Sequence, residues 1–171
     1  MSTLFGTDEL LFSDDTFTDW DGVVLAKVKR PRWNWRSMFT SPGDLEVVRA
    51  DGLSLFTMPE LDGEDVDELR VTTTDEIPPA LVRKKRGLSI LNLGFTVLDG
   101  NGTTLGTIET NHAWDSLAAT LLSGLPVAAA EVSGRSWTLS LKPEGSATWN
   151  VVLLAMVIAA DEMQNRLSGM G

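Results

Sequence analysis

An unbroken run of ten apolar residues near the C-terminus, Val151–Ala160, restricts the possible folds of this chain more than any other feature. The run is rich in Leu, Ala and Met, which favour helix. A helix on a protein surface carries polar side chains every three or four residues, and this run carries none. The sequence therefore predicts a helix that is enclosed on all sides, either by lipid or by the rest of the chain.

The length of the apolar segment decides between these two surroundings. Thr148–Ala160 spans thirteen residues, which make roughly 20 Å of helix at about 1.5 Å per residue. A transmembrane helix needs about 20 apolar residues, and Asp161 and Glu162 end the run at once. We therefore expect no transmembrane span, and a central helix at about 150–167 that the rest of the chain encloses.

Composition limits the classes of function. The 171 residues suit a single domain, 1–171, and the N-terminus has neither the basic nor the apolar segment of a signal peptide. The chain has no cysteine, which fits a cytoplasmic protein and excludes disulfides and thiolate catalysis. With 24 acidic and 14 basic residues, the net charge of −10 argues against nucleic acid as a partner.

No set of residues in the sequence forms a recognisable catalytic or metal site. His112 is the single histidine, so a site with two or three histidines is impossible, and a turn residue is the simpler interpretation. The acidic segment Asp62–Glu68 lacks the ordered spacing of a calcium loop and is interpreted as solvated. We expect no enzyme, no metal and no cofactor.

Short strands account for most of the chain before the helix. Asp-Gly pairs at 21–22, 51–52 and 99–100 lie between apolar segments and predict hairpins, because glycine accepts the positive φ of a tight turn. The pattern Phe-Thr-x-x-Asp-Gly occurs at Phe17 and again 78 residues later at Phe95, which suggests repeated β units. Further strands are expected at Leu117–Leu122, Val127–Val132 and Ser136–Lys142.

About ten or more short strands before one all-apolar helix indicate an antiparallel sandwich or barrel. The inner face of a closed barrel is apolar and must be buried, and a helix that is apolar on all sides must be surrounded by apolar side chains. The simplest arrangement passes the helix through the barrel, so the expected fold is mainly β.

The hairpin that begins at Phe95, the strand that begins at Trp137 and above all Leu153–Met163 resemble the tubby C-terminal-like superfamily. The nearest branch is the LURP-one-related proteins, with phospholipid scramblases as distant cousins, and the resemblance is best from about Gly94 to Leu167. It implies a closed antiparallel barrel of about twelve strands around a central hydrophobic C-terminal helix. It also implies phosphoinositide binding by basic side chains on the barrel surface, as in tubby domains, but no ligand residue can be carried over one by one. The acidic calcium segment of scramblases is not recognisable.

Two basic clusters are the candidate ligand-binding residues. In the first, cations that neutralise phosphate alternate with tryptophans that suit a headgroup boundary; the other interpretation places both tryptophans in the barrel core. The second is a run of four cations, which could instead be a solvated connection. The clusters comprise Lys27, Lys29, Arg30, Arg32, Trp33, Trp35 and Arg36, and Arg83, Lys84, Lys85 and Arg86.

These residues predict a non-enzymatic binding module that recognises an anionic lipid headgroup such as a phosphoinositide, in the cytoplasm and peripheral at the membrane. The alternative is a protein-interaction or scaffold domain without lipid affinity, which the net charge of −10 favours. Asp161, at the end of the apolar run, is expected to have a structural role, held by a cation at the rim of the barrel or by a backbone amide.

Overall fold

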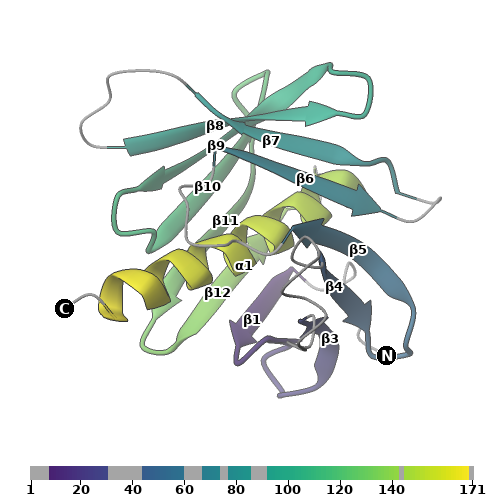
Figure 1. Ribbon diagram of the computed structural model, residues 1–171, viewed down its shortest axis with the longest axis vertical. Coiled ribbons are helices and arrows are strands. Elements are labelled where there is room, and N and C mark those ends of the chain that lie inside the picture. Colours follow the sequence, from purple (N-terminus) through teal and green to yellow (C-terminus); the bar gives the residue numbers. More distant parts are fainter. Residues whose placement is uncertain are drawn as a thin grey trace, which may run out of the picture.

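Apolar residues alternate with polar ones in short segments along the chain, and these segments form twelve strands in a computed structural model (Figure 1). The structure describes residues 8–30, 44–59, 67–73, 77–85, 92–142 and 145–169. The strands are β1 (Glu9–Ser13), β2 (Thr16–Thr18), β3 (Val24–Lys29), β4 (Asp44–Arg49), β5 (Ser54–Pro59), β6 (Glu68–Thr73), β7 (Ala80–Lys84), β8 (Asn92–Asp99), β9 (Thr104–Asn111), β10 (Ser116–Leu121), β11 (Pro126–Ser133) and β12 (Ser136–Leu141).

Every strand pairs antiparallel with its neighbours in sequence, and β1 pairs with β12 to close the barrel. One helix, α1 (Ala147–Gly169), follows the last strand and runs through the middle of the barrel (Figure 1). The expected closed antiparallel barrel of about twelve strands around a central C-terminal helix is therefore confirmed. The helix is longer than the expected 150–167 by three residues at its start and two at its end.

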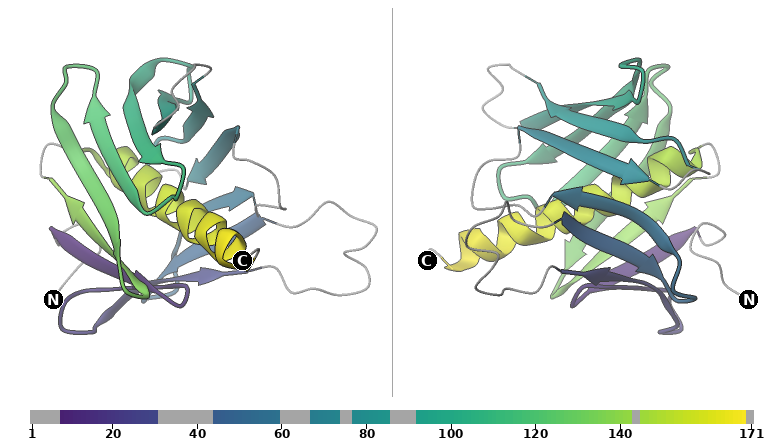
Figure 2. Two further views of the ribbon diagram at one scale, coloured as in Figure 1. Left: turned by 90° about the vertical axis from the view of Figure 1, so that its left-hand side faces the viewer. Right: turned by 45° about the vertical axis from the view of Figure 1, so that its right-hand side comes forward.

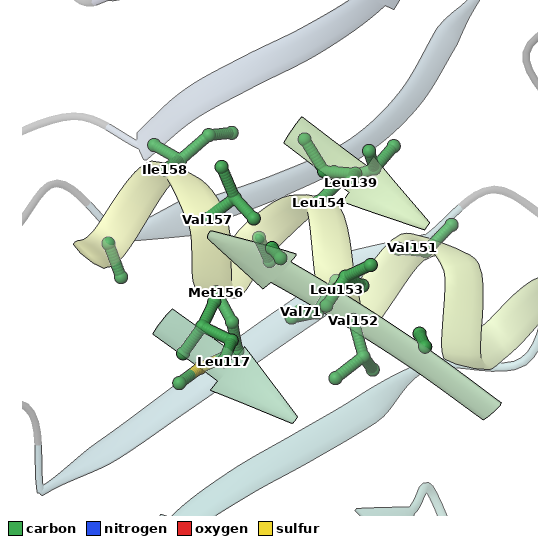
Figure 3. Close-up of a cluster of buried hydrophobic side chains, with 14 of the residues drawn as sticks. Val71, Leu117, Leu139, Val151, Val152, Leu153, Leu154, Met156, Val157 and Ile158 are labelled. Atoms are coloured by element: carbon green, nitrogen blue, oxygen red, sulfur yellow. The ribbon is translucent and has the colours of Figure 1, made fainter. Parts of the chain in front are cut away.

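The barrel is filled by the side chains of α1. All thirteen residues from Thr148 to Ala160 are buried, in agreement with the prediction of an enclosed helix. Val71 of β6, Leu117 of β10 and Leu139 of β12 come from well-separated strands and lie around this segment (Figure 3). Burial on every side explains the missing polar stripe.

The start of α1 depends on two local features. The Ser146 hydroxyl accepts a hydrogen bond from the backbone N–H of Trp149 at 3.4 Å, as a residue at the N-cap does. Trp149 then packs directly on Gly106 of β9, where an added Cβ would lie 2.8 Å from the tryptophan ring and 2.2 Å from the carbonyl oxygen of Thr120. Only glycine lets the helix approach the barrel wall so closely at this point.

Four hairpins at the end of the barrel where α1 begins share one loop geometry. In each, a glycine with positive φ donates its N–H to the carbonyl three residues earlier, and the strand pairing shifts by one residue next to the loop. This is the three-residue loop with a bulge. The four glycines are Gly22, Gly52, Gly102 and Gly124.

The third predicted turn differs in detail from its prediction. Its positive φ falls at Gly102 and not at Gly100 of the Asp99-Gly100 pair. The carboxylate of Asp99 accepts the N–H groups of Asn101 and Thr103, just as Asp19 accepts those of Asp21 and Val23. The structural repeat is therefore Asp-x-x-Gly, which joins Asp19 to Asp99, rather than the predicted Phe-Thr-x-x-Asp-Gly.

The opposite end of the barrel is where α1 leaves it. In Figure 2 the last turns of the helix extend beyond the ends of the strands. Because all neighbours are antiparallel, the odd-numbered strands all end at this rim, which we call the exit rim. The turn between β1 and β2 lies here, with Asp14 and Asp15 both in left-handed conformation, as a two-residue hairpin turn requires.

Candidate functional site

Both basic clusters reach the exit rim, but at different places on the barrel wall. Lys29 and Arg30 stand at the end of β3, and Lys84 and Lys85 stand at the end of β7. Strands β4, β5 and β6 separate them, which places the clusters about 19 Å apart along the wall at the usual spacing of about 4.8 Å per strand. The structure thus brings the described members of the clusters to one end of the barrel without joining them in one pocket.

Among the described members of these clusters, four lysines have no ion-pair partner in the described part of the chain. Lys27, Lys29 and Lys85 are exposed and Lys84 is half-buried. Arg83 is exposed and pairs with Glu68 across the β6–β7 ladder, with 3.3 Å between Nε and Oε2. Arg32, Trp33, Trp35, Arg36 and Arg86 lie outside the described residues, as does most of the acidic segment 62–68.

Arg30 is not a free cation. Its Nε and Nη2 donate to the two carboxylate oxygens of Asp15 at 2.8 and 2.9 Å, and its Nη1 donates to Oε1 of Glu162 in α1. The two carboxylates raise the pKa of the Arg30 guanidinium far above its usual range, chiefly through the hydrogen bonds to Asp15. Arg30 therefore ties the β1–β2 turn to the central helix.

A cleft of about 840 Å³ opens beside this ion triad, between the exit rim and the last turns of α1. Its walls come from the β1–β2 turn, the end of β3, the β11–β12 turn and the helix. Acidic residues Asp14, Asp15, Asp161 and Glu162 line it together with Arg30, Arg135 and Arg166. Because α1 fills the barrel interior, this recess lies outside the barrel core, at its mouth.

Two buried polar atoms in the wall of the cleft lack a hydrogen-bond partner. Trp137, at the start of β12, is only 1% exposed, and its indole N–H has no acceptor. Glu162 gives one carboxylate oxygen to Arg30, while the other oxygen, Oε2, is buried and accepts nothing. Buried polar groups are nearly always hydrogen-bonded, so this pair marks the cleft as a place for a polar partner.

The carboxyl of Asp161 lies in the same cleft and interacts electrostatically with Trp137 and Glu162. Burial raises its pKa above the ordinary value, and the negative charges of Asp15 and Glu162 act in the same direction. The indole N–H of Trp137 and the Arg30 guanidinium oppose the rise. The indole therefore faces Asp161 closely enough to favour its charged form, without the geometry of a hydrogen bond.

Glu162, and not Asp161, is the residue that the rim cation holds. The cation at the rim, Arg30, binds Glu162, and the helix continues from Asp161 to Gly169, so Asp161 is not a helix-terminal residue. Sequence reasoning named Arg30 and Asp161 but missed Asp15, Trp137 and Glu162 as members of one site. The available signal was the Asp14-Asp15 pair before a strand, since aspartate tolerates the left-handed conformation of a tight turn.

His112 lies exposed in the turn between β9 and β10 and is not among the residues that line the cleft. In the described part of the chain, no cluster of three or more His, Cys, Asp or Glu side chains could hold a metal ion. Within those same residues, no helix has both the length and the apolarity to span a membrane.

Comparisons with known proteins support the fold alone. No family model matches the sequence, and no curated protein matches it. A protein of Arabidopsis thaliana, solved by X-ray crystallography, is similar in structure, with a TM-score of 0.59 over 90% of each chain and 14% sequence identity. Two chains of such different sequence therefore share a similar fold.

Proposed function

We propose that this chain is a LURP-one-related member of the tubby C-terminal-like superfamily and acts as a non-enzymatic binding module. The barrel around a hydrophobic C-terminal helix, which the resemblance implies, supports the family assignment. In this proposal the protein works in the cytoplasm and docks end-on to an anionic membrane surface, through phosphoinositides or similar headgroups.

The observation that carries the proposal is that β3 and β7 deliver their lysines to the same rim. Two clusters about 19 Å apart on the wall are too distant to share one small ligand. A flat anionic surface set against the exit rim reaches both at once, and each cation near such a surface contributes about 1 kcal/mol. Lys29, Lys84 and Lys85 stand at the rim itself.

Acidic residues at the same rim weaken the proposed binding to an anionic surface. Asp44 and Glu46 of β4 lie next to the end of β3, and Asp67 and Glu68 lie next to the end of β7. Their repulsion from an anionic surface opposes the attraction that the lysines provide. Binding is therefore weak, reversible and reduced by salt, because exposed charges are screened over about 10 Å at an ionic strength of about 0.1 M.

Vesicle co-sedimentation tests the proposal. The protein should pellet with phosphatidylcholine vesicles that contain a phosphoinositide and not with phosphatidylcholine alone. A variant with Lys29, Lys84 and Lys85 each changed to Gln should lose pelleting, whereas Lys142→Gln, at the other end of the barrel, should retain it. Equally negligible pelleting of the unchanged protein on both vesicle types would rule out lipid docking.

A second candidate function is protein interaction, and exposed apolar side chains at the end where α1 begins favour it. Turns at this end carry Trp20, Val23, Leu53, Leu122 and Leu125, which are between 44% and 70% exposed. The net charge of −10 also weakens attraction to an anionic membrane. A stoichiometric protein partner that is lost in a Leu53→Ser, Leu122→Ser variant, but kept in the lysine variant, would favour this function over lipid docking.

A further inference from the structure

The cleft at the exit rim has the features of a ligand site in its own right. Its wall holds a buried donor without an acceptor, Trp137 Nε1, and a buried acceptor without a donor, Glu162 Oε2. An apolar ligand would leave both groups unsatisfied. A ligand that satisfies both must offer an oxygen acceptor and an N–H or O–H donor within a short distance of each other.

The charges around the two atoms decide which kind of donor fits. Asp15, Glu162 and Asp161 place three carboxyl groups around the guanidinium of Arg30, which already binds two of them, and Arg135 and Arg166 also line the cleft. Buried carboxylates are stable only when paired. A positively charged donor beside Glu162 Oε2 therefore gains more than a neutral hydroxyl does.

The wall of the cleft that holds the indole N–H of Trp137 favours an acceptor. Trp137 follows directly from the β11–β12 turn, which contributes Arg135 to the cleft. Since Arg135 lines the same cleft, an oxygen that accepts the indole N–H is favoured there when it carries a negative charge. Lining charges of both signs thus match a ligand that carries both signs.

We infer that the exit-rim cleft binds a zwitterionic group, an ammonium with a neighbouring anionic oxygen, through Glu162 on one side and the indole N–H of Trp137 on the other. The inference rests on residues that the proposed lysine contacts do not use. It stands whether or not the exit rim docks to a membrane.

This chemistry occurs both in free metabolites and in the ethanolamine headgroup of a phospholipid. Phosphoethanolamine as a probe presents the group in free form, and the indole N–H signal of Trp137 in nitrogen-15 NMR spectra reports on it directly. Trp137→Phe identifies that signal among the six tryptophans. We expect phosphoethanolamine to shift it, and inorganic phosphate or ethylamine to shift it far less.

The decisive variant is Glu162→Gln, which can keep an acceptor for Arg30 but replaces the unpartnered oxygen with an N–H₂ group. We expect phosphoethanolamine affinity to fall about tenfold or more, in line with the loss of one charge-assisted hydrogen bond. Glu109→Gln, an exposed change on β9, is the matched control and should bind normally.

Two results would overturn the inference: a Trp137 signal that phosphoethanolamine leaves unmoved, or affinity that is equal in Glu162→Gln. Either can be obtained without loss of the fold, because the remaining five indole signals report on folding. Vesicles of phosphatidylcholine with and without phosphatidylethanolamine then distinguish the sources. Pelleting that depends on Glu162 identifies a lipid headgroup, and binding of the free probe without such pelleting identifies a soluble metabolite.

Discussion

Arg30 at the end of β3 binds Glu162 of the central helix, 132 positions later in the chain, while its other nitrogens bind Asp15. The barrel wall and the helix that fills it are otherwise joined mainly by apolar packing, such as that of Trp149 on Gly106 near the start of the helix. This ion triad gives the helix a defined position at the exit rim. It also builds one wall of the cleft.

Loss of the Arg30 guanidinium should destabilise the fold measurably. Arg30→Met leaves Asp15 and Glu162 without their shared partner, and hydrogen bonds to charged groups are each worth roughly 1.5–3 kcal/mol. Because Arg30 and Asp15 are partly exposed, we expect a decrease in the free energy of unfolding of about 2 kcal/mol in urea titrations. Arg83→Met, which removes an exposed pair with Glu68, should change the free energy by about 0.5 kcal/mol or less.

The enclosed helix should not tolerate a charge. Leu154 has no exposed surface, so Leu154→Asp puts an unpaired carboxylate into the barrel core and should prevent soluble folding. Leu154→Ala leaves only a cavity and should cost about 3 kcal/mol while the chain still folds. Circular dichroism and thermal melts distinguish the two. Cooperative unfolding of soluble Leu154→Asp protein would contradict the enclosed position.

Gly106 should be irreplaceable even by alanine. The new Cβ would lie 2.2 Å from the backbone oxygen of Thr120 and 2.8 Å from Trp149, so the helix or the strand must shift. Overpacking of this kind typically costs about 1–3 kcal/mol, and contact with rigid backbone places Gly106→Ala at or above the upper value. Gly169→Ala, where nothing lies within 4 Å, is the control and should leave the melting temperature unchanged or slightly higher.

The contribution of Asp161 to stability should decrease as the pH rises, whereas the contribution of a salt-bridged aspartate increases. Its folded pKa is raised, so the folded chain holds the proton more tightly than the unfolded chain. The stabilisation from the protonated carboxyl is full below 3.8, the ordinary value, and is lost as the pH rises through the folded pKa.

Asp161→Asn should therefore be more stable than the unchanged protein at neutral pH, because it removes the burial of a charge near Asp15 and Glu162. The difference should shrink as the pH falls from the folded pKa of Asp161 towards 3.8, and should be smallest below 3.8, where both side chains are neutral. Urea titrations across this range provide the measurement. Lower stability of Asp161→Asn at pH 7 would show that the carboxylate is favourably paired in the folded state.

Local patterns were sufficient for the elements of the fold. Strand β12 alternates Trp137, Leu139 and Leu141 inward with polar residues outward, as its sequence predicts, since neighbouring side chains in a strand point to opposite faces. In the third hairpin, the sequence pattern did not identify the glycine that adopts the positive φ. Both Gly100 and Gly102 can adopt a positive φ, and the Asp99 carboxylate, by accepting two backbone N–H groups, selects the loop that uses Gly102.

The apolar run Val151–Ala160 requires an enclosed helix whatever surrounds it, because a helix without a polar face is stable only with apolar neighbours on every side. From this requirement and the many short strands, the barrel followed. That Asp15, Arg30, Trp137 and Glu162 form one site is visible only in the folded chain. These residues are brought together by barrel closure and by the depth at which the helix is inserted, and neither quantity is encoded in any local stretch of the chain.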